Sequence, residues 1–393
     1  MLRRIQQYLR SVGPRNFGLA LTLQLGLATF LAHGYDFRVS YVAGRNVASG
    51  TSPYVGGVLE GSLSLGYGPT VQGMGETPFW AIYTGFAYFL SGGEVFLFNL
   101  VSKTPVVLAN ILLSYMAYLR GCDGRFFLLN PYVLLVTASW GKPDNIATLL
   151  AILPLLYMPS WPTASMAASA SLMVKPIGIP LLPSYVGYHR HHQVTAFLAG
   201  LALLSSLFFF TPFIVLGWPL ATVVEGLPNW FKPAGGLSPF NIVEILTGSL
   251  SMPDPYTLLG LLAPTSTLVL TVIGYLFPPN HGGQALRLAL LSSLTFFSLR
   301  PWISEQNLYL IMTLIILLNR RMSSRLLWVI PILFSAANLS LPQQIYLLRP
   351  TVIDELHAID HVVRLWVRFG LSVAWLALVW KTAMVRGLLG WRN

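Results

Sequence analysis

Charge is scarce in this chain: only 9% of its 393 residues are Asp, Glu, Lys or Arg, whereas 54% are hydrophobic. Soluble domains carry about 25% charged residues, because their surface must stay hydrated. This scarcity excludes an ordinary soluble domain, and the 13% aromatic content excludes a disordered chain. Apolar segments near the thickness of a bilayer follow one another, which predicts an all-α polytopic membrane protein.

Cysteine is nearly absent, since Cys122 is the only one. A single thiol excludes a disulfide framework, an iron–sulfur cluster and a cysteine zinc site. The sequence has no P-loop and no dinucleotide-binding glycine pattern, which argues against a nucleotide-driven pump. His189, His191 and His192 stand beside Arg190 in a short predicted loop, which favours a solvated loop over a metal site. No inverted repeat relates the two halves, which weakens a transporter interpretation.

Acidic residues are also few, 13 against 24 basic ones, so the net charge is +11. The basic residues form short clusters between apolar segments, a pattern that indicates membrane topology and not a nucleic-acid partner. Most of them fall on the side of the N-terminus, which predicts cytoplasmic N- and C-termini. Most acidic residues fall on the opposite side, so we expect the working site on the external or luminal face.

The apolar segments predict about 10–12 transmembrane helices in a single integral-membrane domain spanning residues 1–393. A basic lead-in over 1–16 precedes a first helix over 17–32, which we expect to be retained because no signal-cleavage site follows. The helical bundle 95–393 contains the remaining apolar segments, near 95–119, 126–140, 144–158, 162–174, 176–188, 194–217, 256–278, 286–299, 304–319, 326–341 and 361–383. Pro176 divides 162–188 into two expected half-helices that meet inside the membrane.

Residues 35–94 are predicted to form a long first external loop with an interfacial aromatic helix at 79–92. As a membrane span, 79–92 would invert the topology of everything after it. As an interfacial helix, it leaves Arg120 and Arg125 on the N-terminal side, in agreement with the other basic clusters.

Asp36 directly follows the first predicted helix, in the segment GYDFRVSYVAGRNVASGTSPY (34–54). In one interpretation it is a general base that takes a proton from an acceptor hydroxyl. In the other it is a solvated helix-end carboxylate or pairs with Arg38. The second interpretation is favoured by default, because base catalysis requires a pocket and a perturbed pKa.

Trp140 to Asn145 form a polar turn between two short apolar segments and include Lys142 and Asp144. Ionisable residues at membrane depth usually mark a function. Asp144 is also placed to cap the next helix, so both interpretations stay open.

Lys175 and the segment RPWISEQNLYL (300–310) carry the remaining candidates. Lys175 could hold a phosphate as a compact charge or extend to the membrane interface. Arg300 suits a phosphate because its donors form a bidentate fork. Glu305 could pair with Arg300, position it or bind a sugar hydroxyl. Asn307 is a further polar candidate close to Glu305 in the sequence.

Taken in order, five segments resemble a known family. DFRVSYVAGRNVASGTSPY (36–54) resembles the first luminal loop of mannosyltransferases that use a dolichyl-phosphate sugar. The other four are similar to segments of the catalytic subunit of GPI mannosyltransferase I: LLNPYVLLVTASWGKPDNIATLL (128–150), VKPIGIPLLP (174–183), SPFNIVEIL (238–246) and ISEQNLYL (303–310). The ordered set resembles the GT-C superfamily over roughly residues 17–320.

This resemblance implies a GT-C hexosyltransferase that moves mannose or another hexose from a polyprenyl phosphate to a lipid-linked or glycan acceptor, with inversion. Asp36 matches the second Asp of the family's Asp-x-Asp motif and would be the general base. Gly34 replaces the first Asp, which argues against a divalent metal, so no cofactor is expected. The expected substrate-binding residues are Arg38, Lys142, Asp144, Asn145, Lys175, Arg300, Glu305 and Asn307.

The expected partners are the lipid-phosphate donor, the acceptor and the bilayer, with a small membrane subunit as a further candidate. The membrane would be the plasma membrane in a prokaryote and the endoplasmic reticulum in a eukaryote. Two alternatives remain. One is a transporter or flippase of a lipid-linked or small polar solute, and the other is a non-catalytic subunit that would tolerate loss of Asp36.

Overall fold

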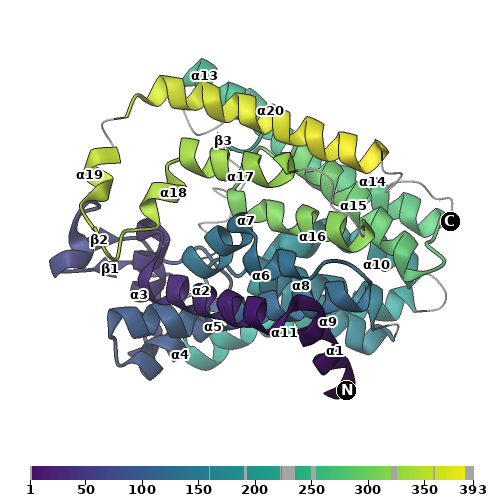
Figure 1. Cartoon of the computed structure of the whole chain (residues 1–393), viewed down its shortest axis with the longest axis horizontal. Helices are drawn as coiled ribbons and strands as arrows, with labels where there is room; N and C mark the ends of the chain where they lie inside the picture. The colour runs from purple at the N-terminus through teal and green to yellow at the C-terminus, as the bar shows by residue number, and fades with distance from the viewer. Residues whose placement is uncertain are drawn as a thin grey trace. The chain divides into compact units, whose positions relative to one another are not determined.

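The structure, a computed structural model, describes residues 2–158, 160–189, 193–221, 223, 235–248, 254–319, 325–356 and 359–385. Helices dominate it, and its strands are two residues long (Figure 1). Among the described residues, four helices are long and apolar enough to cross a membrane: α5 (Val95–Leu119), α11 (Val194–Leu216), Leu258–Leu276 and α20 (His361–Val385). The chain is therefore an all-α integral membrane protein, as predicted. The count of 10–12 spans and the GT-C architecture remain predictions.

The chain forms two compact units. The first contains Met1–Ile146 and Leu339–Ile359, and the second contains Ala147–Asn319, Ser324–Asn338 and Asp360–Asn393. A single GT-C domain that includes both units remains a prediction.

The first unit begins with helices that match the sequence pattern. The amphipathic α1 (Leu2–Val12) places Tyr8 against α5, where its hydroxyl donates to Ser114 Oγ at 2.8 Å. Gly13, at φ 87°, and Pro14 separate α1 from α2 (Pro14–Phe30), which occupies the predicted first apolar segment. Near the end of the chain, α18 (Ser340–Gln343) and α19 (Val352–Leu356) complete the unit.

Residues 34–48 form a helix, α3 (Gly34–Ala48), at the start of the predicted external loop, whose place outside the membrane remains a prediction. Helix α3 packs closely on α4 (Pro78–Ser91): a Cβ at Gly44 would lie 2.7 Å from the Thr84 carbonyl oxygen. An irregular segment follows α3 and contains η1 (Gly61–Ser64) and the antiparallel pair β1 (Gly57–Val58) and β2 (Thr70–Val71).

Helix α4 confirms the helix predicted at 79–92, although its place at a membrane interface remains a prediction. Phe79, Phe86 and Phe89 are exposed on one face, while Trp80 and Thr84 are buried on the other. The helix ends at Gly92, which adopts a left-handed conformation as helix-terminating glycines commonly do.

The segment that leads to the predicted polar turn consists of α6 (Arg125–Leu129), α7 (Pro131–Val133) and the π-helix η2 (Leu134–Ser139). Asn130 caps the N-terminus of α7. Its side chain accepts a hydrogen bond from the Tyr132 backbone N–H at 2.9 Å, and Pro131 occupies the first helical position. Single π-helical turns are frequent at functional sites. The turn then gives way to α8 (Asp144–Leu156).

The second unit contains the predicted helix break. Between α9 (Trp161–Val174) and the 3₁₀ helix η3 (Pro176–Leu181), Lys175 is extended at φ −165°, because the following proline disfavours a helical conformation. α10 (Leu182–Tyr188) continues from η3. The break is confirmed, and its depth in a membrane remains a prediction.

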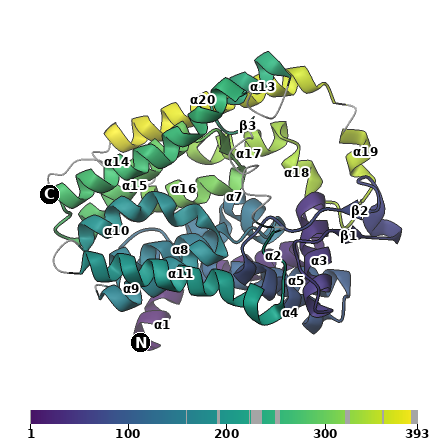
Figure 2. The same cartoon turned by 180° about the vertical axis from the view of Figure 1, so that it is seen from behind.

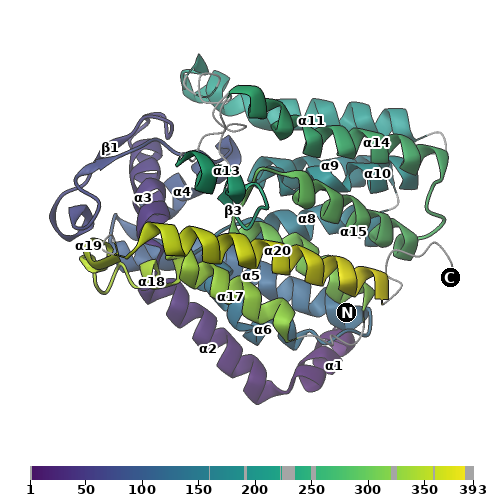
Figure 3. The same cartoon turned by 90° about the horizontal axis from the view of Figure 1, so that it is seen from above.

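The other elements of this unit are α13 (Asn241–Thr247), η5 (Asp254–Leu261), α14 (Leu262–Leu276), α15 (Gly282–Leu299), η6 (Glu305–Asn307), α16 (Leu308–Leu318) and α17 (Leu326–Ala337). β3 (Gly235–Gly236) pairs in parallel with β4 (Trp302–Ile303). Helix α9 packs beside α11, and α14 packs beside α15 (Figures 2 and 3). Helix α17 packs against α20.

Candidate functional site

A pocket in the first unit brings together residues that are far apart in the sequence. The empty space within it, about 440 Å³, includes open solvent. Its walls come from α3, α4, α5 and the turn 140–143. The polar and charged lining side chains are Asp36, Ser40, Glu76, Thr84, Asn99, Ser102, Lys103 and Lys142.

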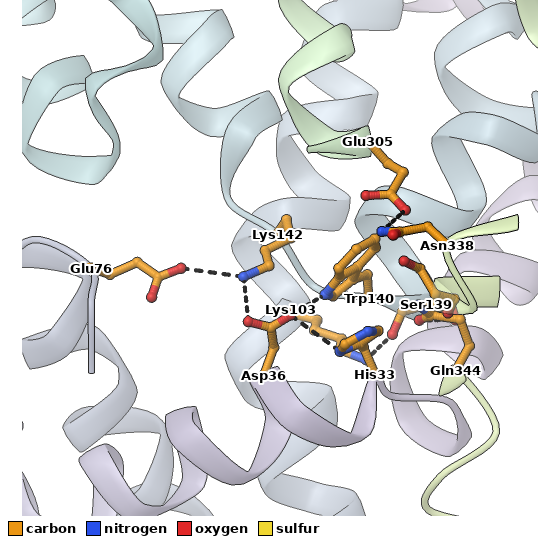
Figure 4. A network of polar contacts seen from close by, with 11 residues as sticks. His33, Asp36, Glu76, Lys103, Ser139, Trp140, Lys142, Glu305, Asn338 and Gln344 are labelled. Carbon is orange, nitrogen blue, oxygen red and sulfur yellow. Dashed lines mark hydrogen bonds and ion pairs between the residues drawn. The ribbon is translucent and has the colours of Figure 1, made fainter. Parts of the chain in front are cut away.

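Asp36 is held by three side chains in this pocket (Figure 4). The Lys142 ammonium lies 2.7 Å from Asp36 Oδ1, while the Trp140 indole N–H donates to Oδ2 at 2.6 Å. His33 Nδ1 lies 3.2 Å from the same Oδ2. The alternative pairing of Asp36 with Arg38 is wrong, because Lys142 makes the ion pair and the Arg38 guanidinium donates to the Gly68 carbonyl oxygen.

These contacts change the acidity of Asp36. Burial alone would raise its pKa, but the charge of Lys142 and the contact with His33 outweigh burial and hold the pKa of Asp36 well below its ordinary value. The carboxylate is therefore ionised at neutral pH. Because the strength of a general base follows its pKa, Asp36 is a weak base as long as Lys142 stays in place.

The same pair stabilises the charge of Lys142. Burial would lower the pKa of Lys142, but the carboxylates of Asp36, Glu76 and Asp144 together raise it above its ordinary value. Lys142 therefore carries a full positive charge in the pocket while its side chain is only 10% exposed.

Glu76 is a site residue that was not among the candidates predicted from the sequence. Its Oε1 lies 3.5 Å from Lys142 Nζ, and its side chain is 21% exposed at the pocket. The available sequence signal was an acidic residue two positions before the aromatic helix, which by itself does not indicate a partner 66 residues away. Glu76 and Asp36 thus share one ammonium.

The turn that carries Trp140 and Lys142 rests on a second lysine. Lys103, in α5, is buried and donates hydrogen bonds to the carbonyl oxygens of Leu31 and Ser139. Gly141 adopts φ 83°, and a Cβ there would lie 2.6 Å from Lys103 Cε. Both the conformation and the lack of space therefore require glycine at this position.

Two residues outside the pocket lining orient this arrangement. The His33 ring stacks on Trp140, with ring centroids 4.5 Å apart, and Ser139 Oγ donates to Gln344 Oε1 at 3.0 Å (Figure 4). His33 directly precedes α3 and Gln344 comes from the last segment of the unit. Neither residue was selected from the sequence, because their roles depend on packing between distant segments.

Three predicted residues of the first unit make contacts outside this pocket. Arg38 donates to the Gly68 carbonyl oxygen, and its guanidinium carbon lies 5.1 Å from the centre of the Tyr67 ring. Asn145 donates to the carbonyl oxygen of Val106 at 2.6 Å and to Asn110 Oδ1 at 2.7 Å. Asp144 is fully buried at the start of α8.

None of these three residues is among those that line the pocket. Arg38 fastens the irregular segment to α3, and Asn145 joins α8 to α5. A role for any of them in substrate binding therefore remains a prediction.

The other predicted residues belong to the second unit. Lys175 is half-buried at the helix break. Arg300 ends α15, with its guanidinium carbon 5.8 Å from the centre of the Phe296 ring, and its carbonyl oxygen accepts a hydrogen bond from Ser238 Oγ at 2.8 Å. Phosphate binding by Lys175 and Arg300 remains a prediction.

Glu305 and Asn307 lie in η6, and both are buried. Glu305 Oε1 accepts a hydrogen bond from Asn338 Nδ2 at 3.1 Å (Figure 4). Asn307 Oδ1 accepts from the Ser304 backbone N–H at 3.0 Å, which fixes the start of the 3₁₀ turn. Their contact with sugar hydroxyls remains a prediction.

The residues around Asp36 do not suit a divalent cation. Gly34, two residues before Asp36, supplies no second carboxylate, and a Cβ there would lie 2.7 Å from Tyr346 and 2.8 Å from Tyr67. An ammonium, moreover, occupies Asp36 Oδ1. Within the described ranges, no group of three or more His, Cys, Asp or Glu residues is arranged to hold a metal ion.

Of the histidine cluster, only His189 falls within the described residues, while His191 and His192 lie outside them. His189 is buried, and its ring stacks on Phe197 with centroids 4.9 Å apart. Burial lowers the pKa of His189, so its ring is neutral at physiological pH.

No protein-family model matches this chain, and no curated protein is similar to it in sequence.

Proposed function

We propose that the chain is a GT-C glycosyltransferase that moves mannose or another hexose from a polyprenyl phosphate to the hydroxyl of a lipid-linked or glycan acceptor. The observation that carries this proposal is the pairing of Asp36 with Lys142 at one pocket of an integral membrane protein. The reaction needs a carboxylate to receive a proton and a cation to stabilise a leaving phosphate. The pocket contains both.

The proposed step is a single displacement. The acceptor oxygen forms a bond with the anomeric carbon as the bond from that carbon to the phosphate oxygen breaks. The electron pair of the broken bond stays on the phosphate, and the hydroxyl proton goes to Asp36. Attack from the face opposite the leaving group inverts the anomeric centre.

Helix α4 supports a lipid-borne donor. Its exposed face carries Phe79, Phe86 and Phe89, whereas Trp80 and Thr84 on its other face line the pocket. A polyprenyl chain would pack along the exposed aromatic face while the phosphate and sugar enter the pocket. In the proposed orientation both termini are cytoplasmic and the pocket opens to the external or luminal side.

The test is sugar transfer by the purified protein from synthetic polyprenyl-phosphate mannose to total membrane lipid. Asp36→Asn is compared with wild type and with Asp123→Asn, which removes an exposed carboxylate paired with Arg125. We expect Asp36→Asn to lower the rate by about 10²–10⁴-fold, the usual contribution of a general base, while Asp123→Asn leaves it unchanged. We also expect EDTA to leave the wild-type rate unchanged.

Two outcomes would overturn the proposal. If wild type transfers no sugar from any of several polyprenyl-phosphate hexoses, the transporter or non-catalytic subunit interpretation takes precedence. If Asp36→Asn transfers sugar as fast as wild type, Asp36 is not the base.

A further inference from the structure

We propose that Lys142 is exchanged between two anions during the reaction. Before the donor binds, Lys142 neutralises Asp36 and Glu76. When the donor enters, the ammonium moves to its phosphate group and thereby frees Asp36 Oδ1 for the acceptor proton. This inference rests on the proposed function and adds to it a coupling between donor binding and base activation.

The two oxygens of Asp36 have different partners, which makes such an exchange feasible. Trp140 and His33 both contact Oδ2, whereas Lys142 contacts Oδ1 alone. If the ammonium leaves, the indole N–H still fixes the carboxylate through Oδ2. Oδ1 then becomes an oriented acceptor without a cation.

Lys142 is the pocket cation that can move. Its partners are two carboxylate side chains at the pocket, and one of the two contacts is long, at 3.5 Å. Lys103 also lines the pocket, but its ammonium is tied to two backbone carbonyl oxygens, those of Leu31 and Ser139. A lysine side chain has four flexible carbons, so its ammonium can change partners while the turn that carries it stays in place.

The chemistry of the donor favours the exchange. A polyprenyl-phosphate sugar is a phosphodiester with one negative charge, and cleavage of its sugar bond adds a second charge to the phosphate. A cation beside that group therefore binds the transition state more tightly than the donor itself. The same movement strengthens the base, because the charge of Lys142 is what most strongly lowers the pKa of Asp36.

The other groups around Asp36 do not replace Lys142. His33 and Trp140 keep their contacts with Oδ2. The charge of Asp36 contributes to raising the pKa of the Tyr35 and Tyr67 phenols. Burial raises the pKa of both tyrosines, so both remain neutral. Glu76 is negative and adds no positive charge. Once the ammonium leaves, the pKa of Asp36 should therefore rise toward its ordinary value.

The exchange makes an unusual prediction for binding, since Asp36→Asn, the variant with slower catalysis, should bind the lipid-phosphate product better. Polyprenyl phosphate, which carries no sugar to transfer, is titrated into the purified full-length protein in nanodiscs. We expect about tenfold tighter binding by Asp36→Asn, because the amide no longer competes for the ammonium, and about tenfold weaker binding by Lys142→Gln. Lys142→Arg should bind within about threefold of wild type because it keeps the charge.

Glu76→Gln and Arg349→Gln serve as companion variants. Glu76→Gln removes the weaker competitor and should tighten binding by about threefold, and it provides the test even if Lys142→Gln does not fold. Arg349→Gln removes an exposed cation that pairs with Glu355 and should leave binding unchanged. Equal or weaker binding by both Asp36→Asn and Glu76→Gln would overturn the exchange.

Polyprenol and inorganic phosphate distinguish the sources of the anion. Polyprenol should bind equally to wild type and Asp36→Asn, because it offers no anion, and a tenfold preference for the variant would overturn the proposal. If inorganic phosphate alone reproduces the order of the variants, the exchange holds and its anion is a soluble phosphate.

The binding titration tests the exchange, and the transfer assay tests the proposed function, so the two can fail separately. If the order of binding holds but no sugar is transferred, the proposed function fails and the anion exchange stands. If sugar is transferred but neither Asp36→Asn nor Glu76→Gln binds polyprenyl phosphate more tightly, the transferase stands and the exchange fails.

Discussion

Each unit of the molecule contains a carboxylate paired with a cation, and the two pairs differ in access. Asp36 and Lys142 are 2.7 Å apart, with side chains 26% and 10% exposed. Glu244 of α13 and Arg368 of α20 are 3.5 Å apart, with side chains 3% and 5% exposed. The first pair opens into a pocket, whereas the second is enclosed between two packed helices.

The difference shows that a charge inside a membrane protein does not by itself mark a site. Both pairs contain ionisable residues within a membrane protein, which is the usual signal for function. A ligand can reach Lys142 and compete for its ammonium, but Arg368 is closed off by its own packing. We therefore expect changes in the first pair to affect substrate handling and changes in the second to affect stability.

The largest expected effect on stability is at the enclosed pair. Arg368→Gln leaves the buried Glu244 carboxylate without its arginine, with His361 Nε2 at 3.9 Å from its other oxygen, and should destabilise the protein by about 3–5 kcal/mol. Denaturant unfolding in detergent micelles measures this change. The double variant Glu244→Leu/Arg368→Met should recover most of the loss, because it removes both charges. If Arg368→Gln lowers the free energy of unfolding by less than about 1 kcal/mol, the Glu244–Arg368 pair is solvated. The two pairs would then not differ in access to solvent.

A smaller effect is expected from Gly141→Ala, which disturbs the turn behind the open pair. It combines the cost of a left-handed alanine with a clash against Lys103, so we expect about 2–4 kcal/mol of destabilisation. The matched control is Gly50→Ala, since Gly50 has a similar φ of 79° but open space around it, and it should lose only about 1 kcal/mol.

Gly141→Ala should also slow sugar transfer, because the turn carries Lys142, whereas Gly50→Ala should not. Equal stability losses in the two glycine variants would mean that Lys103 moves aside and does not support the turn.

The smallest expected effect is the pH dependence of stability that Asp36 contributes. Because folding lowers the pKa of Asp36, its contribution is complete above the unfolded value of about 3.9 and is lost as the pH falls through the lower folded value. The pKa of Lys142 is raised on folding, so its contribution is complete below about 10.4 and is lost only at higher pH.

The difference in Tm between wild type and Asp36→Asn should therefore be constant from about pH 5 to 9 and shrink below about pH 4. Thermal unfolding followed by tryptophan fluorescence across this range tests it. A difference that already shrinks between pH 7 and 5 would mean that Lys142 does not hold down the pKa of Asp36.

Much of the helical structure follows from local sequence. The apolar segment at 95–119 coincides with α5, and the segment at 361–383 lies within α20. The break at Lys175 was predictable because a proline restricts the residue before it. The packing of α3 was not predictable in this way, since the close approach of Gly44 to Thr84 of α4 joins segments that are distant in the sequence.

For the candidate site, the sequence by itself determined the chemistry available: it placed Asp36 and Lys142 among the candidates and showed that Gly34 lacks a carboxylate. Only the tertiary structure decided that Asp36 pairs with Lys142, 106 residues away, and not with its neighbour Arg38. Only the tertiary structure added Glu76 and His33 to the site. The physical reason is that hydropathy and proline effects act over a few residues, so they can be predicted from the local sequence. Contacts between side chains, and the pKa values that follow from them, depend instead on how distant helices pack.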